Sequence, residues 1–69
     1  MQALSSAAQG VYTIQWMFGV PEILDQLHDW EICEGSVIRV ITKYRDAVMI
    51  GNGDRRFILE NEVAERIRV

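Results

Sequence analysis

The sequence predicts a small, mainly β fold: an antiparallel barrel with one principal helix. Three observations lead to this prediction. Residues 33–42 form a run rich in β-branched side chains, the dipeptide Asn52-Gly53 separates two further apolar runs, and a proline-led helical pattern occupies residues 21–29. With 69 residues, the chain is expected to form a single domain over residues 1–69.

The first strand is predicted over residues 11–18, where large apolar side chains alternate with polar ones. The aromatic residues of this part of the chain, with Met17, suit either a peptide groove or a small core, and the core is favoured. Met17 and Trp30 are expected to be partly exposed. Residues 1–10 are expected to form an extended arm that packs one apolar side chain and turns at Gly10. The aromatic residues in question are Tyr12, Trp16, Phe18 and Trp30.

A short helix is predicted from Pro21 to Asp29. Gly19 ends the first strand, and proline suits the first helical position because its missing N–H is not needed there. Glu22 in the first turn complements the helix dipole. A helix of this length is not stable alone, so it is expected to cover a sheet or one end of a barrel. Its apolar residues recur at helical spacing: Ile23, Leu24, Leu27 and Trp30.

The central strand is predicted after a turn at Gly35. Its apolar residues fall on both alternation phases, with Ile38 and Val40 on one phase and Val37 and Ile41 on the other. Such a strand is either covered on both sides or bent so that each half faces a different sheet.

A hairpin is predicted at Asn52-Gly53, the dipeptide that type I′ turns favour. It follows a strand over residues 47–51, and a loop of those two residues would place Ile50 opposite Arg55. Residues 60–66 have a short helical pattern, and residues 67–69 alternate and are expected to close the barrel. The hairpin would share one apolar face made of Val48, Ile50, Phe57 and Leu59.

Charge divides the chain into two unlike halves. Residues 1–34 contain five acids and no Lys or Arg, a net charge of −5, whereas residues 35–69 contain seven basic residues and five acids, a net charge of +2. The total of −3 disfavours general nucleic-acid binding, which relies on clustered Lys and Arg. The basic residues among the later strands, including Arg39, Arg55 and Arg56, are expected to be ordinary solvated surface, and a local basic strip stays open as an alternative.

The composition also bears on disulfide bonds and on the cellular compartment. Cys33 is the only cysteine, so no internal disulfide can form. The first nine residues do not resemble a signal peptide, and no stretch approaches the ~20 apolar residues of a membrane span. A cytoplasmic protein without membrane insertion is expected.

A pattern of apolar and glycine positions runs along nearly the whole chain: Leu4, Ala7, Gly10, Leu24, Leu27, Ile32, Gly35, Ile38, Val40, Leu59, Ala64, Ile67 and Val69. This pattern resembles ferrous-iron transport protein A and the SH3-like C-terminal domain of iron-dependent repressors. That family usually has Gly where the chain has Glu31 and often Pro where it has Glu34, so the helix end lacks its usual left-handed glycine.

The resemblance implies a five-stranded SH3-like barrel with the helix inserted between the first two strands. It also implies a cytosolic accessory to a membrane transporter of ferrous iron that contains a GTPase domain, acting by protein–protein contact with no catalysis and no cofactor of its own. A small nucleic-acid-binding barrel is the alternative function. Weak self-association is a further possibility for so small a core.

No metal site or catalytic pair is predicted. His28 and Cys33 lie five residues apart among acids, but no second soft ligand recurs, and no third group orients them for catalysis. The predicted partner-binding site is instead the acidic helix and the turn after it, where no basic residue occurs and Trp30 offers a large apolar anchor. Its residues are Asp25, Asp29, Trp30, Glu31 and Glu34.

Overall fold

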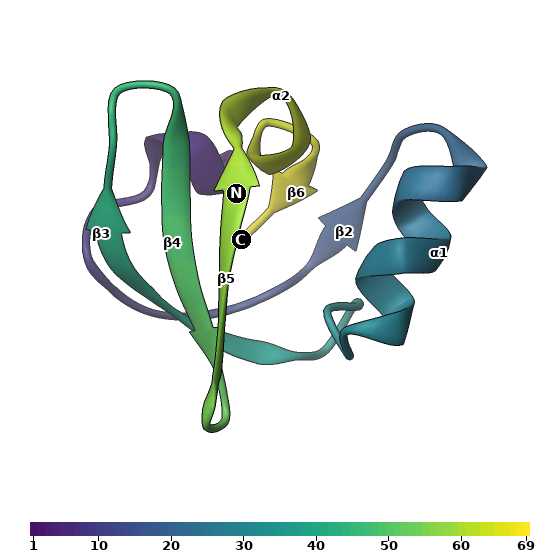
Figure 1. Cartoon of the computed structure of the whole chain (residues 1–69), viewed down its shortest axis with the longest axis horizontal. Coiled ribbons are helices and arrows are strands. Elements are labelled where there is room, and N and C mark those ends of the chain that lie inside the picture. Colours follow the sequence, from purple (N-terminus) through teal and green to yellow (C-terminus); the bar gives the residue numbers. More distant parts are fainter.

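A computed structural model describes all residues, 1–69. It is mainly β, with one principal helix and a second helix of a single turn (Figure 1). This confirms the class that the sequence predicts. In chain order the elements are η1 (Leu4–Ser6), β1 (Gly10–Thr13), β2 (Trp16–Met17), α1 (Pro21–Asp29), β3 (Val37–Lys43), β4 (Ala47–Asn52), β5 (Arg55–Glu60), α2 (Asn61–Ala64) and β6 (Ile67–Arg68).

The strands form two antiparallel sheets. The larger has four strands in the order β1-β3-β4-β5, and the smaller pairs β2 with β6. β3 lies inside the larger sheet, between β1 and β4, as expected of the central strand. The start and end of the chain lie together, since the backbones of Gln2 and Val69 donate to each other at 3.0 and 2.8 Å.

The first strand is not continuous, and its predicted alternation is wrong beyond Ile14. The Ile14 N–H still donates to Ser36 beside β3, but the Gln15 N–H donates to Arg68 of β6, so the chain passes from one sheet to the other. Because the chain changes sheets between Ile14 and Gln15, the alternation of buried and exposed residues shifts by one position. Met17 is therefore buried with 6% exposure, whereas Trp16 is 51% exposed, and the prediction of a partly exposed Met17 is wrong.

β3 contains a bulge but belongs to one sheet along its length, so its two apolar phases mark the two faces of that sheet and not a strand divided between two sheets. Val40 pairs with Ile50 and Thr42 pairs with Met49, so Ile41 is an extra residue in a bulge. Ile38 and Val40, before the bulge, point into the core, while Val37 is exposed.

The hairpin between β4 and β5 turns one residue later than predicted. Asn52 pairs with Arg55, and the two-residue loop is Gly53-Asp54. Gly53 has a φ of 66° while Asp54 does not have a positive φ, the combination of a type II′ turn rather than type I′. Ile50 therefore faces Phe57 instead of Arg55, but a partner shift of two residues leaves each side chain on the face predicted for it.

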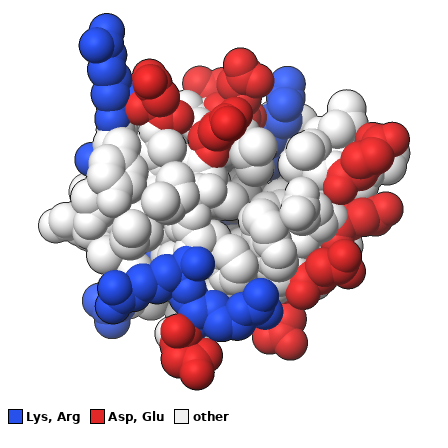
Figure 2. All heavy atoms as spheres, viewed as in Figure 1, with Lys and Arg blue, Asp and Glu red and all other residues white.

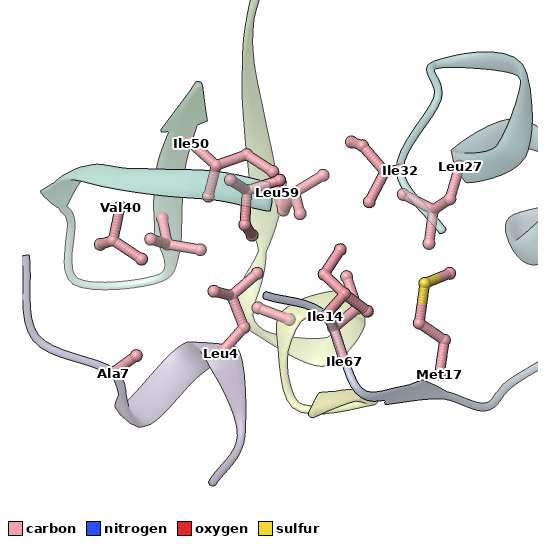
Figure 3. Packing of buried hydrophobic residues seen from close by; sticks show 13 residues of the cluster. Leu4, Ala7, Ile14, Met17, Leu27, Ile32, Val40, Ile50, Leu59 and Ile67 are labelled. Atoms are coloured by element: carbon pink, nitrogen blue, oxygen red, sulfur yellow. The ribbon is translucent and has the colours of Figure 1, made fainter. Parts of the chain in front are cut away.

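One core fills the space between the two sheets and α1 (Figure 3). The segment before β1 contributes more than predicted, because η1 buries Leu4 and the following Ala7 is buried as well. α1 has the predicted bounds and stands to one side of the sheets, with Leu27 as its one fully buried residue (Figure 1). The core consists of Leu4, Ala7, Ile14, Met17, Leu27, Ile32, Ile38, Val40, Val48, Ile50, Leu59, Ala64 and Ile67.

Candidate partner-binding site

The predicted site begins where α1 ends. The Ile32 N–H donates to the Leu27 carbonyl at 2.8 Å, and the Glu31 N–H donates to the His28 carbonyl at 2.9 Å. These two bonds form a Schellman motif, which places Glu31 at the position that usually holds glycine. Glu31 has a φ of 62°, the only positive value at a non-glycine residue of the chain. The departure from the family pattern is thus accommodated by strain at Glu31 rather than by a different helix end.

Two side chains, those of Ser36 and Asn52, form hydrogen bonds to the turn that follows α1. The Glu31 carbonyl accepts hydrogen bonds from Ser36 Oγ and from Asn52 Nδ2, both at 2.9 Å. The Cys33 N–H donates to the same Ser36 Oγ at 3.1 Å. Sequence reasoning assigned Asn52 to the hairpin loop and missed this role. The side chain is available for it because Asn52 belongs to β4 and points to the same face as Ile50.

Trp30 is a wall of this site rather than a protruding anchor. Its ring stacks on Phe57 of β5 with centroids 4.8 Å apart and planes 18° apart, and the residue is half-buried. Beside the stack lies an open cleft of about 290 Å³ between α1 and β5. The cleft is lined by Ile23, Gln26, Leu27, Trp30, Ile58, Leu59, Glu60 and Val63.

The four predicted acidic residues are all exposed around α1 and the following turn. Asp25 and Asp29 lie four residues apart and so share one face of α1. In Figure 2 the side of the molecule that carries α1 shows acidic side chains with no basic one among them. Asp25 and Asp29 lie on a face of α1 different from the one that lines the cleft, and Glu31 and Glu34 follow in the turn after the helix.

The same region offers no arrangement for metal binding. No group of three or more His, Cys, Asp and Glu side chains is placed to hold an ion. His28 is exposed, and the Cys33 thiol lies 3.4 Å from Ser36 Oγ. No helix has the length and apolar character needed to cross a membrane.

A second exposed group consists of Trp16 in β2 and Phe18 just after it, two residues that the sequence pattern placed in the core. Trp16 and Phe18 have ring centroids 4.9 Å apart, and the Arg68 guanidinium lies 5.7 Å from the Phe18 ring. Their exposure follows from the phase change at Gln15 described above.

An apolar cleft and an exposed acidic surface are features suited to binding another protein. A comparison with known families identifies the family. The model of the FeoA domain matches residues 4–69, and the chain belongs to the FeoA family. Membership gives it an accessory role in ferrous-iron transport and confirms the resemblance found in the sequence. No curated protein and no solved structure matches the chain significantly.

Proposed function

We propose that this chain is a cytoplasmic, non-catalytic protein that binds the cytosolic part of a ferrous-iron transporter, the part that carries a GTPase domain. The observation that supports this most directly is the apolar cleft between α1 and β5, formed by a helix that also carries exposed acidic residues, in a chain of the FeoA family. The contact surface comprises Asp25, Asp29, Trp30, Glu31 and Glu34 together with the cleft.

The cleft and the acids have different tasks in this contact. An apolar side chain of the transporter enters the cleft beside Trp30 and is desolvated there, which supplies most of the affinity. The acids on the other face of α1 and in the turn after it meet Lys or Arg of the transporter, speed the encounter and select the partner by charge.

Charge reversal on α1 tests the proposal. Asp25→Lys with Asp29→Lys is expected to weaken binding to the purified cytosolic domain of the transporter about tenfold, since each exposed charge pair contributes ~0.2–1 kcal/mol and reversal adds repulsion. The salt dependence of the dissociation constant is expected to fall as well. Isothermal titration calorimetry at two salt concentrations measures both quantities.

The matched control is Glu62→Lys with Glu65→Lys, which makes the same charge change at exposed acids in and just after α2. This control is expected to bind nearly as tightly as the unchanged chain. Equal weakening in both double variants would mean that net charge matters and not the α1 surface. Unchanged affinity in a folded Asp25 and Asp29 variant would move the contact elsewhere, first to the arginine-bearing strands.

Ile23 tests the cleft itself. It lines the cleft with 37% of its surface exposed and lies outside the core. Ile23→Ala is therefore expected to reduce affinity several-fold without lowering the melting temperature. Trp30 is a poorer choice for this purpose because its stacking on Phe57 also stabilises the fold.

We also infer that the two sheets act as one five-stranded SH3-like barrel, in which β1 and β2 are one bent strand and α1 is inserted before β3. The backbone bond from Gln15 to Arg68 and the bonds between Gln2 and Val69 support this reading.

A further inference from the structure

The outer face of the four-stranded sheet carries a row of residues in exact cross-strand register. Val11 of β1 pairs with Arg39 of β3, Arg39 pairs with Gly51 of β4, and Gly51 pairs with Arg56 of β5. Directly paired residues share one face of a sheet, so all four positions lie side by side on this face. Gly51 has no side chain, and the row is therefore hollow between its two arginines.

The hollow is a measurable feature of the surface. It has a volume of about 540 Å³. The Ile41 side chain of the bulge in β3 lies against Gly51 and forms part of the wall of the hollow, since a Cβ on Gly51 would lie only 3.1 Å from Ile41 Cδ1. The hollow is lined by Val11, Val37, Ile38, Arg39, Ile41, Gly51, Gly53, Asp54 and Arg56.

The two arginines of the row are free to bind a ligand. Both are exposed, and neither takes part in a side-chain hydrogen bond within the chain. Arg55 differs, since its guanidinium lies over the Phe57 ring at 5.0 Å. Arg39 and Arg56 stand two strand spacings apart, about 10 Å between backbones, on either side of Gly51.

We propose that this hollow binds an extended segment of another protein, with an Asp or Glu carboxylate held between Arg39 and Arg56. The guanidinium fork matches a carboxylate, and two of them around one hollow can bind both of its oxygens. Val11 and Val37 beside the arginines are 55% and 58% exposed, so they contact aliphatic residues that flank the carboxylate.

A nucleic acid suits the hollow less well than such a segment. Polyanions require many basic contacts, whereas this hollow has two arginines and an acid, Asp54, at its edge. The surface is distinct from the acidic cleft at α1 and has the opposite charge, so this inference stands whether or not the transporter binds at α1.

The test uses a short peptide as probe. Backbone amide shifts of the full chain are followed by NMR while acetyl-Val-Glu-Val-amide is added at millimolar concentration. Shifts are expected at Val11, Arg39, Gly51 and Arg56. The matched peptide with Gln in place of Glu is expected to bind about tenfold more weakly, the size of losing a hydrogen bond to a charged group.

Two double variants locate the carboxylate. Arg39→Gln with Arg56→Gln is expected to abolish the preference for the Glu peptide. Lys43→Gln with Arg45→Gln makes the same charge change at exposed residues outside the hollow and is expected to retain it. Both variants replace exposed side chains, so the amide spectrum is expected to stay that of the folded chain.

Four results would overturn the proposal. The first is the absence of shifts in this row, and the second is equal binding of the Glu and Gln peptides. The third is a stronger response of the same amides to an oligothymidylate than to the Glu peptide, which would assign the hollow to nucleic acid. The fourth is shifts in this row that depend on protein concentration alone, which would assign it to a second copy of the chain.

Discussion

Replacing Glu31 by glycine is expected to stabilise the domain. Glu31 has a φ of 62° and makes its hydrogen bonds through its backbone, so glycine keeps the bonds and removes the strain. A non-glycine residue in this region costs ~1–2 kcal/mol, and the freedom of glycine in the unfolded chain offsets ~0.5–1 kcal/mol of that. The central value of the net gain is about 0.75 kcal/mol, or roughly 3–6 °C in melting temperature for a domain of this size.

The assay is thermal and urea unfolding followed by far-UV circular dichroism. Glu31→Ala is the matched control, because it removes the same charge but keeps a Cβ in the left-handed conformation. It is expected to gain little or nothing. If Glu31→Ala stabilised as much as Glu31→Gly, relief of charge repulsion would be the cause and the argument from strain would fail. No gain in Glu31→Gly would also refute it.

The same substitution separates stability from binding. Strained residues that persist in a fold often lie at sites of function. If the Glu31 carboxylate contacts the transporter, Glu31→Gly raises the melting temperature and weakens binding, effects of opposite sign that loss of folding cannot produce. Calorimetric titration of the variant with the cytosolic domain measures the second effect, and unchanged affinity would remove Glu31 from the contact surface.

Two further predictions concern the strands, with urea unfolding as the measurement. Met17→Ala is expected to lower the free energy of unfolding by about 2–5 kcal/mol because Met17 is buried. Trp16→Ala, at an exposed neighbour, is expected to lower it by less than about 1 kcal/mol. A larger loss in Trp16→Ala than in Met17→Ala would contradict the shift of alternation between the sheets. Gly53→Val is expected to cost about 1–3 kcal/mol, since a β-branched residue tolerates the φ of 66° poorly, and an unaffected midpoint would argue against the type II′ turn.

The parts of the fold that depend on neighbouring residues were predictable from the sequence. Pro21 and the helical spacing that follows it give α1 its observed bounds. The β-branched run around Ile38 gives β3. Each of these features follows from backbone restriction and side-chain period within a few residues.

The parts that failed depend on contacts between distant residues. Alternation alone cannot show that the chain leaves β3 for β6 at Gln15, because the partner, Arg68, lies at the other end of the sequence. The hairpin loop was predicted one residue too early for a related reason. Asn52 lies in β4, where its side chain donates a hydrogen bond to the distant Glu31 carbonyl instead of forming part of the loop. In the candidate site, the four acids are exposed, as expected of charged side chains, while Trp30 lies against Phe57, a contact that no local pattern reveals.

Asn52 offers a way to test the two proposed surfaces against each other. Asn52 follows Gly51 in β4, and successive strand residues point to opposite faces. Gly51 therefore lines the outer hollow, while the Asn52 side chain hydrogen-bonds the turn after α1. Asn52→Ala removes one donor to the Glu31 carbonyl, which keeps its bond from Ser36, and is expected to cost about 1 kcal/mol of stability. Because the turn is loosened and the outer face is untouched, binding to the transporter domain is expected to weaken while the Glu peptide binds the hollow as before. Equal weakening at both surfaces in the folded variant would mean that a change on one face of β4 also disturbs binding on the other face.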